Sequence, residues 1–498
     1  MNVNPITRLD YPDPDVIRVE DTYYMVSTTM HFMPGCEILQ SFDLVHWEHV
    51  TYVYETLDHT DAQQLKSGQN IYGQGMWAAS LRYHEGRFYI CFVANDTRKT
   101  YLYTSEKIDG PWKKQLIEGF YHDGSLLFDE DGRNYIVYGN DEIWITELNE
   151  DLTAPKKDGL HRLLVSDHKN PELGYEGSHI QKINGYYYIF LVHSLRDRWM
   201  RTEACFYSDS LEGEFTGGDV LCDDRGYCGQ GVAQGGIVDT PDGKWYAMLF
   251  QDSGAVGRIP ILLPVTWKEH FPVFGQNGHV PEEIEVHSTR PGYIYQPLVG
   301  SDDFCNGLLP RWQFNHDPDP RYYHLDALQG TYTITTREVC TELTQAVNTL
   351  TQRMSYPSCA AEVTVDASAL KEGDVAGLCA LQSCYAAVGI TKHHGKYEVL
   401  MLDKKEDGIL DMTEGTVVES HQMDFRLEAD FCNMKDEARC YYRVNKGDWL
   451  PIGTVHKLYF KLDHFTGCRF GLFCYAAEET GGSACFRDFK YYDVDEIS

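Results

Sequence analysis

The sequence predicts an all-β protein, a five-bladed β-propeller followed by an antiparallel β-sandwich. Three observations support this prediction. An aromatic, strand-like signature recurs five times in the first 295 residues, glycine-containing turns separate short hydrophobic runs, and long helical periodicity is hard to find. A chain of 498 residues is also too long for one ordinary domain.

The five signatures are the units of the predicted propeller. They read DTYYMV (21–26), GRFYICF (86–92), GRNYIVY (132–138), GYYYIFL (185–191) and GKWYAML (243–249). Aligned on Tyr24, Tyr89, Tyr135, Tyr188 and Tyr246, they lie 65, 46, 53 and 58 residues apart. Periods near 50 residues with hairpin turns and several strands are typical of propeller blades. We therefore assign residues 1–295 to five blades whose first strands line a central channel.

The blade pattern ends in a stretch rich in Pro and Gly, HSTRPGYIYQPLVGSDDF, within which we place a connector at 296–302. Residues 303–498 contain alternating strand patterns without the blade signature. Examples are AAEVTVDAS (360–368), KYEVLMLDK (396–404), ARCYYRVN (438–445) and HKLYFKLDHF (456–465). Turn sequences such as KKEDG and NKGD separate them, so we predict an antiparallel sandwich without a catalytic centre of its own.

One position of the repeat carries chemistry. Twelve residues before the aligned tyrosine, the last four units have Trp77, Asp123, Glu176 and Gln234, and eleven residues before it the first unit has Asp13. Equivalent positions of blades around one axis converge, so these five side chains are expected at one mouth of the channel. Asp13 alone, in the turn-like sequence YPDPD, would be weak support. The shared register is what makes the set significant.

Carboxyl groups at such a mouth are suited to acid–base catalysis. Burial and neighbouring negative charge separate their pKa values, so that one group stays ionised while another keeps its proton. Hydrolysis of an acetal requires such a pair, and Trp77 offers an apolar face on which a sugar ring could pack. No Ser-His-Asp order, Walker loop or HExxH sequence supports acyl or phosphoryl transfer.

Composition narrows the partners. The formal net charge of −32 argues against nucleic acid and anionic membranes and fits a neutral ligand. Fifteen scattered cysteines without a CxxC pair predict free thiols and no zinc or iron–sulfur site, and the first residues show no leader, so we expect a cytoplasmic protein. No apolar run is long enough for a membrane span. A homo-oligomer is compatible with the sequence.

Several segments together resemble glycoside hydrolase family 43, in its group with a C-terminal sandwich. They are NPITRLDYPDPDVIRVEDTYYMVSTT (4–29), MPGCEILQSFDLVHWE (33–48), MWAASLRYHEGRFY (76–89), HDGSLLFDEDGRNYIVYG (122–139), YEGSHIQKINGYYYIF (175–190) and GRIPILLPVTW (257–267). The start of the sandwich is similar to that family at DDFCNGLLPRWQFNHDPDP (302–320) and LTQR (350–353). The resemblance covers essentially the whole chain and implies a jelly-roll, concanavalin A-like sandwich.

The resemblance also implies roles for individual residues. Asp13, in the YPDP segment, corresponds to the general base, Glu176, in the EGxH segment, to the general acid, and Asp123 to the residue that orients the acid and raises its pKa. Arg258, in the GR segment, corresponds to a contact with substrate hydroxyls. Family members invert the anomeric configuration in one displacement.

This chain departs from the family pattern at the expected sugar subsite and in the channel. The family often has His, commonly tied to a central calcium, where this chain has Gln234, which is a poorer fixed anchor for a metal. Related xylosidases often carry Phe in place of Met30, and an aromatic residue followed by Phe in place of Phe32 and Met33. We count Trp77, Arg258, Phe32, Met30 and Gln234 as candidate substrate-binding residues, name no metal ligand, and expect no cofactor to be needed for the chemistry.

The expected activity is exo-acting, inverting release of a terminal pentose, β-D-xylose or α-L-arabinofuranose or both, from hemicellulose-derived oligosaccharides. Two alternatives stay open. One is an endo-acting arabinanase on the same propeller, and the other is a sugar-binding propeller without catalysis, which the presence of all three acids argues against.

Overall fold

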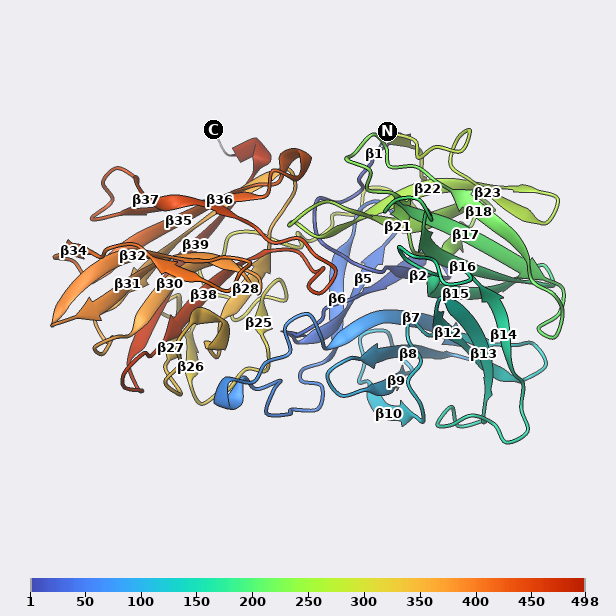
Figure 1. The fold of residues 1–498 in the computed structure, drawn as a ribbon, viewed down its shortest axis with the longest axis horizontal. Coiled ribbons are helices and arrows are strands. Elements are labelled where there is room, and N and C mark those ends of the chain that lie inside the picture. Colours follow the sequence, from blue (N-terminus) through green and yellow to red (C-terminus); the bar gives the residue numbers. More distant parts are fainter. Residues whose placement is uncertain (1, 497–498) are drawn as a thin grey trace.

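The computed structural model describes residues 2–496, so residue 1 and residues 497–498, at the ends of the two predicted domains, lie outside it. Two β-rich lobes lie side by side, the propeller in blue to yellow-green and the sandwich in orange to red (Figure 1). The helical elements described are short 3₁₀ turns, namely η1 (Lys66–Gly68), η2 (Leu343–Gln345), η3 (Cys432–Met434) and η4 (Val494–Glu496). No helix in residues 2–496 is long and apolar enough to cross a bilayer.

The first lobe is a five-bladed propeller, which confirms the prediction. Each blade is an antiparallel sheet, and the aromatic signature forms its second main strand. Blade 1 contains β2 (Asp15–Val19), β3 (Thr22–Ser27), β5 (Gly35–Ser41) and β6 (Glu48–Tyr54); blade 2 contains β7 (Met76–His84), β8 (Arg87–Ala94), β9 (Lys99–Ser105) and β10 (Lys113–Ile117). Blade 3 contains β11 (Ser125–Phe128), β12 (Asn134–Asn140), β13 (Glu142–Leu148) and β14 (His161–Ser166); blade 4 contains β15 (Glu176–Ile183), β16 (Tyr186–Ser194), β17 (Arg201–Ser208) and β18 (Thr216–Leu221). Blade 5 contains β19 (Val232–Ala233), β20 (Ile237–Asp239), β21 (Trp245–Asp252), β22 (Arg258–Lys268) and β23 (Phe271–Phe274).

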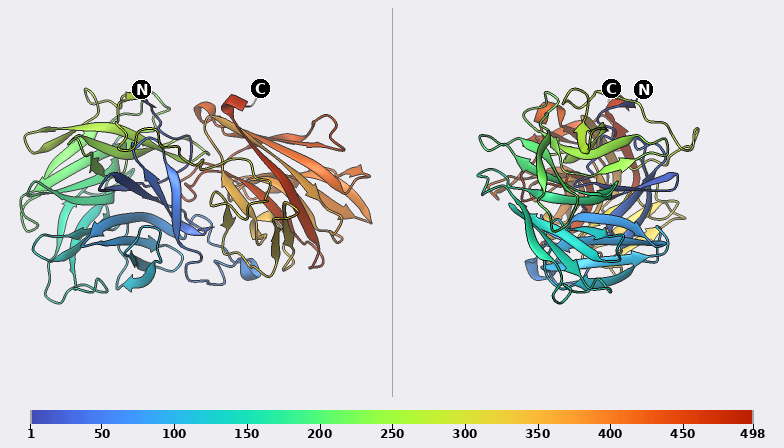
Figure 2. Two further views of the ribbon diagram at one scale, coloured as in Figure 1. Left: turned by 180° about the vertical axis from the view of Figure 1, so that it is seen from behind. Right: turned by 90° about the vertical axis from the view of Figure 1, so that its right-hand side faces the viewer.

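The N-terminal segment closes the ring of blades. Strand β1 (Asn2–Val3) pairs with β24 (Glu283–Ile284), which follows blade 5. The buried Asn4 side chain donates hydrogen bonds to the carbonyl oxygens of Leu262 (2.7 Å) and Pro281 (3.0 Å). Blades 1 and 5 are thereby fixed to each other, which holds the channel mouth in one geometry. Figure 2 (right) presents the propeller toward the viewer with the sandwich behind it.

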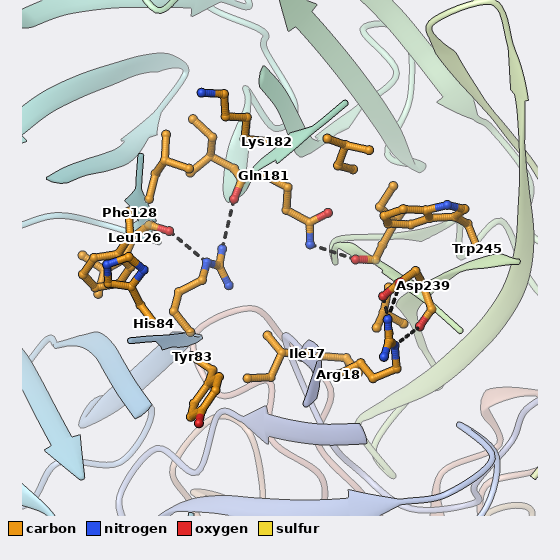
Figure 3. Close-up of a pocket in the computed structure, with 17 residues that line it drawn as sticks. Ile17, Arg18, Tyr83, His84, Leu126, Phe128, Gln181, Lys182, Asp239 and Trp245 are labelled. Atoms are coloured by element: carbon orange, nitrogen blue, oxygen red, sulfur yellow. Dashed lines mark hydrogen bonds and ion pairs between the residues drawn. The ribbon is translucent and has the colours of Figure 1, made fainter. Parts of the chain in front are cut away.

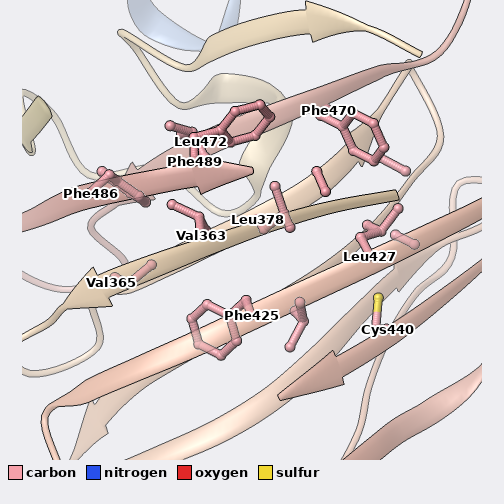
Figure 4. Packing of buried hydrophobic residues seen from close by; sticks show 14 of the residues in the cluster. Val363, Val365, Leu378, Phe425, Leu427, Cys440, Phe470, Leu472, Phe486 and Phe489 are labelled. Carbon is pink, nitrogen blue, oxygen red and sulfur yellow. The ribbon is translucent and has the colours of Figure 1, made fainter. Parts of the chain in front are cut away.

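The second lobe is a sandwich of two antiparallel sheets. One sheet runs β33 (Leu410–Met412), β32 (Lys396–Lys404), β31 (Tyr385–His393), β30 (Val375–Leu381), β38 (Arg469–Tyr475), β28 (Leu350–Arg353), β25 (Gln313–Asn315) and β4 (Phe32–Met33), with β34 (Thr416–Val418) on β32. The other runs β26 (Tyr323–Asp326), β27 (Thr331–Thr335), β39 (Ser483–Asp493), β29 (Ser358–Asp366), β35 (Gln422–Asp430), β36 (Glu437–Arg443) and β37 (Leu450–Lys457). Alternate residues of both sheets meet in one apolar core (Figure 4).

The two lobes are joined by strand pairing and by buried charges. Strand β4 leaves blade 1 and pairs with β25, so the propeller supplies the edge strand of a sandwich sheet. Behind it, Arg353 of the sandwich forms a buried 2.8 Å ion pair with Glu37 of blade 1. Asp10 accepts hydrogen bonds from the backbone N–H groups of Arg258 (2.7 Å) and Gly467 (2.8 Å). Because a buried charge is costly unless it is paired, these contacts fix the sandwich in place against the channel mouth.

Candidate active site

The three predicted acids come together at one mouth of the channel. Asp13 and Asp123 lie just before the first strands of blades 1 and 3, and Glu176 begins β15 of blade 4. Asp13, Asp123 and Gln234 share a left-handed backbone, with φ of 52°, 48° and 65°. In blades 2 and 4 the residue after the repeat position, Ala78 (φ 30°) or Gly177 (φ 64°), takes this conformation instead. Such backbone is strained for residues other than glycine, and it recurs at this place in every blade.

Asp13 is held as an acceptor of two strong hydrogen bonds. Its Oδ1 atom accepts from Nη1 of Arg258 at 2.6 Å, and its Oδ2 atom accepts from the Thr28 hydroxyl at 2.5 Å. The Arg258 guanidinium is anchored in turn by Asp252, whose second oxygen accepts from Arg201 at 2.8 Å. These buried hydrogen bonds and ion pairs hold the Asp13 carboxylate in one orientation, as the role of a general base requires.

The other two acids share a histidine. The Nε2 atom of His122 lies 3.4 Å from Oε2 of Glu176 and 3.5 Å from Oδ2 of Asp123. The same Glu176 oxygen accepts a 2.8 Å hydrogen bond from Asn140, and the same Asp123 oxygen accepts a 2.9 Å bond from the Gly177 N–H. The side chains of His122 and Glu176 remain 22% and 18% exposed, against 7% for Asp123. Glu176 and His122 therefore face the open site, and Asp123 lies beneath them.

The three groups of this cluster have displaced pKa values. Burial, together with the charges of Glu176 and Asp13, raises the pKa of Asp123 to about 6. Burial by itself would lower the pKa of His122, but Asp123, Glu176 and Asp13 outweigh it and raise that pKa to about 9. Burial likewise favours a raised pKa for Glu176, yet the hydrogen bond and positive charge of His122 hold it below its usual value. Both directions favour a proton on His122 over one on Glu176.

The cluster of His122, Asp123 and Glu176 is also the group among residues 2–496 whose metal-binding atoms come within 4.8 Å of one another. The two carboxylate oxygens that face His122 already accept hydrogen bonds from Asn140 and from the Gly177 N–H. We therefore interpret it as an acid–base cluster.

The sandwich contributes a residue that the sequence did not single out. Phe465, in the segment between β37 and β38, is 5% exposed and lies against both Trp77 and Arg258. Its ring centroid is 5.1 Å from that of Trp77, in an edge-on arrangement, and 3.8 Å from the guanidinium carbon of Arg258. Trp77 in turn lies 6.5 Å from the His122 ring. Phe465 has no repeat partner, so the repeat could not have found it, whereas His122 could have been noticed as the residue beside Asp123.

Met30 and Phe32 lie beneath this wall and within the domain interface. The Thr466 hydroxyl donates to the Met30 sulfur at 3.3 Å, and Phe32, which is 1% exposed, packs under the Arg469 guanidinium at 3.5 Å. Gln234 is 3% exposed, and its backbone N–H donates to Glu203 at 2.7 Å. The Gln234 side chain packs so closely on Gly177 that a Cβ there would lie 2.7 Å from its Cγ. These three residues shape the site from behind the groups that face it.

The channel below the acids contains a fixed cation. The Arg82 guanidinium donates to Asp15 (2.8 Å), to the Ser125 hydroxyl (2.7 Å) and to the carbonyl oxygens of Leu81, Leu126 and Ile180. These acceptors come from blades 1 to 4. Calcium takes six to eight oxygen ligands, whereas here a guanidinium already binds the Asp15 carboxylate, the Ser125 hydroxyl and three carbonyl oxygens, and Gln234 stands at the family's His position. The channel residues fit a guanidinium and do not fit a central calcium.

A cavity of about 410 Å³ opens at the opposite mouth (Figure 3). Arg82 is among its lining residues, and the Arg18–Asp239 pair lies beside Trp245 on one wall. His84 stacks on Phe128 at 4.6 Å on the facing wall. Asp13, Asp123 and Glu176 are not among its lining residues, so this cavity is separate from the acid cluster.

Comparison with known proteins identifies the family of this chain. The family profile "Glycosyl hydrolases family 43" matches residues 3–272, more than half of the sequence. The chain belongs to this family. A second profile, "Beta xylosidase C-terminal Concanavalin A-like domain", matches residues 301–492, which covers the sandwich. This family 43 protein is thus a glycoside hydrolase with a concanavalin A-like domain, as predicted.

Relatives of the family 43 protein carry two kinds of name. It is 26% identical to a beta-xylosidase of Formosa agariphila, over 99% of this chain and 89% of that one. It is 24% identical to a non-reducing end alpha-L-arabinofuranosidase of Bacteroides ovatus, over 82% and 79%. A solved structure described as a bifunctional GH43-CE protein of Bacteroides eggerthii matches with a TM-score of 0.91 and 42% identity, over all of this chain. This chain spans 64% of the length of that bifunctional protein.

Proposed function

We propose that the protein is an exo-acting, inverting glycoside hydrolase that releases a terminal pentose from hemicellulose-derived oligosaccharides. The observation that carries this proposal is the arrangement of two carboxyl systems at one mouth. Asp13 is bound to Arg258, and Glu176 is bound to His122 beside Asp123. One system is suited to accepting a proton and the other to supplying one, which is what single-displacement hydrolysis of an acetal needs.

In this mechanism, Glu176 donates a proton to the glycosidic oxygen as the bond to the anomeric carbon breaks. A water molecule attacks that carbon from the opposite face, and Asp13 accepts the proton of the water. Asp123 orients Glu176 through the Gly177 N–H that it binds and keeps negative charge beneath the acid. The Arg258 guanidinium keeps Asp13 oriented and presents its remaining donors to the hydroxyls of the sugar.

The enclosure formed by Phe465 supports release from a chain end. Phe465 closes the space between Trp77 and Arg258 from the sandwich side. A site closed on one side admits one sugar end, whereas an endo-acting enzyme needs a groove open at both ends. The endo-acting arabinanase remains the second candidate. A solved family 43 structure with a TM-score of 0.87 and 27% identity, over 99% of both chains, is described as an engineered enzyme with both endo-xylanase and exo-arabinofuranosidase activity.

The pentose is β-D-xylose, α-L-arabinofuranose or both. The names of the Formosa agariphila and Bacteroides ovatus relatives support each sugar. The high negative charge of the protein favours a neutral oligosaccharide over nucleic acid or an anionic membrane as its partner. We also propose a cytoplasmic site of action from the free thiols, ten of which are buried, and a reaction that needs no cofactor, since the channel cation is Arg82.

The test is hydrolysis of xylobiose, arabinosyl-xylotriose and linear arabinan oligomers by the wild-type protein and by Glu176→Gln. Monosaccharide as the first product, formed with inverted configuration in proton NMR, and a loss of about 10²- to 10⁴-fold in the variant are expected. First products longer than a monosaccharide would favour the endo-acting arabinanase. Retained configuration, or unchanged rates in Glu176→Gln, would remove the proposed mechanism.

A further inference from the structure

His122 occupies a place that the mechanism above leaves unused. It precedes Asp123 in the segment before β11, and its backbone carbonyl accepts a 3.1 Å hydrogen bond from Gly139, which fixes the segment. Its Nε2 atom points at the two acidic oxygens that lie 3.4 and 3.5 Å away. The side chain is partly exposed, so it touches both the buried acids and the solvent side of the site.

The charges around His122 come from several elements and do not cancel. Asp123 from its own segment, Glu176 from β15 and Asp13 from the segment before β2 are acidic. Of the cations, Arg258 is paired with Asp13 and Asp252, and Arg201 is paired with Asp252. Asn140, which is neutral, donates to Glu176. The imidazolium of His122 is therefore the positive charge nearest to Glu176 and Asp123.

This arrangement creates a difficulty for the proposed acid. A general acid needs its proton when the glycosidic bond breaks, yet the positive charge of His122 favours the ionised form of Glu176 in the open site. A neutral sugar that enters the site expels water and lowers the local dielectric. Under those conditions a neutral pair, imidazole with carboxylic acid, becomes favourable relative to an ion pair.

We propose that His122 is a positioning and proton-storing residue that delivers its Nε2 proton to Oε2 of Glu176 when the sugar enters. This inference rests on the proposed role of Glu176 as the general acid. In the step, the N–H bond of Nε2 breaks and an O–H bond forms on Glu176, which leaves neutral imidazole. That proton then passes to the glycosidic oxygen, which takes the electron pair of its bond to the anomeric carbon. After release, His122 regains a proton from solvent and Asp13 loses one to solvent, so protons balance over the cycle.

The first experiment observes His122 directly in the wild-type protein. With ¹⁵N-labelled histidine, NMR should report an imidazolium at His122 near neutral pH in the free enzyme. A loss of that proton should follow when a non-hydrolysable pentose analogue binds. A His122 signal that is already neutral at neutral pH, or one that stays protonated in the complex, would overturn the proposal. This measurement needs no variant and so does not depend on how a variant folds.

The second experiment compares His122→Gln with His287→Gln, a control at an exposed histidine that pairs only with surface carboxylates. In His122→Gln the acid proton must sit on Glu176 itself. The alkaline limb of kcat/KM should therefore move to lower pH by roughly one unit or more. Hydrolysis of xylobiose should fall at least about 100-fold, while a dinitrophenyl pentoside, whose leaving group needs little protonation, should be hydrolysed at a nearly unchanged rate.

The outcomes separate the two proposals. An unchanged alkaline limb, or equal losses on both substrates, shows a merely structural role and overturns the inference about His122. If Glu176→Gln hydrolyses xylobiose normally, the proposed acid itself is wrong. If Glu176→Gln is inactive but His122→Gln keeps the wild-type pH dependence of kcat/KM, the proposed function is retained. Only the proposed proton-storing role of His122 is then wrong.

Discussion

The guanidinium carbon of Arg258 lies 3.8 Å from the ring centroid of Phe465, although one residue belongs to blade 5 and the other to the sandwich. Arg258 also binds Asp13 at 2.6 Å, so the contact links the proposed base directly to the second domain. Asp10 reinforces the link because its two oxygens accept from the backbone N–H groups of Arg258 and Gly467. The sandwich is thus part of the wall of the candidate active site.

Removal of the Phe465 ring should open this wall. We expect Phe465→Ala to raise KM for xylobiose and lower kcat/KM by about 10- to 100-fold, since a buried aromatic contact and a cation–π contact are lost. The matched control is Trp449→Ala, which removes a similar aromatic–Arg contact, with Arg443 at 4.2 Å, on the far part of the sandwich. Steady-state kinetics and product analysis of both variants decide the matter; equal kinetics in the two would argue against a role of Phe465 in the site.

Asp13→Asn should separate catalysis from folding. Asn keeps an oxygen that can accept from Arg258, so we expect the melting temperature to change little, while kcat falls by about 10²- to 10⁴-fold because the amide cannot take a proton from water. Asp21→Asn is the control, since Asp21 pairs with Arg290 on the surface. Calorimetry and initial rates on the same samples provide the measurement. A variant with wild-type turnover would exclude Asp13 as the base.

Arg82 should be a structural cation of the channel. Replacing it by Met leaves Asp15 without that partner and several carbonyl oxygens unsatisfied, so we expect a loss of about 3–5 kcal/mol in unfolding free energy. Arg321→Met removes an exposed Arg that pairs with Asp319, and it should change stability far less, because water screens an exposed ion pair. Denaturant unfolding compares the two. If Arg82 is the cation of the channel, chelators and calcium should leave the wild-type melting temperature unchanged. A clear drop in melting temperature with chelator would contradict this role of Arg82.

Asp436 should make stability depend on pH. Burial raises its pKa to about 6, and its Oδ1 atom accepts from the Ala255 N–H at 3.1 Å. A raised carboxyl pKa means that the folded state binds the proton more tightly than the unfolded chain. The contribution of Asp436 to the free energy of unfolding is therefore fully present below about pH 4 and is lost as the pH rises through about 6. We expect Asp436→Asn to exceed the wild type by about 1–3 kcal/mol at pH 8, with the difference disappearing near pH 4. Unfolding curves across this range test the sign; a variant less stable than the wild type at pH 8 would refute it.

Much of the fold was predictable because the repeat is local. Each aromatic signature forms the second main strand of its blade, and each tight turn lies between adjacent strands. The register of the repeat also placed Asp13, Asp123 and Glu176 at one mouth, since equivalent residues of blades around an axis must converge. In the first unit Asp13 lies eleven rather than twelve residues before the aligned tyrosine, and this offset has a structural counterpart. In blades 2 and 4 the residue with left-handed backbone, Ala78 or Gly177, also lies eleven residues before the tyrosine.

Contacts between residues far apart in the chain could not be read in this way. The sequence predicts Met30 and Phe32 as parts of the sugar subsite, and in the structure they lie against Thr466 and Arg469 of the sandwich. That position follows from the pairing of β4 with β25, which joins residues about 280 positions apart. No spacing rule within the propeller contains this information.

The sequence by itself determined the five blades, the sandwich, the family and the three acids, since these depend on periodicity and on motifs within short segments. Only the tertiary structure decided that Phe465 closes the site, that Arg82 occupies the channel and that His122 stands between Asp123 and Glu176. The physical reason is that burial, hydrogen-bond partners and the electrostatic environment depend on every element that packs around a group. They are therefore fixed only when distant segments meet.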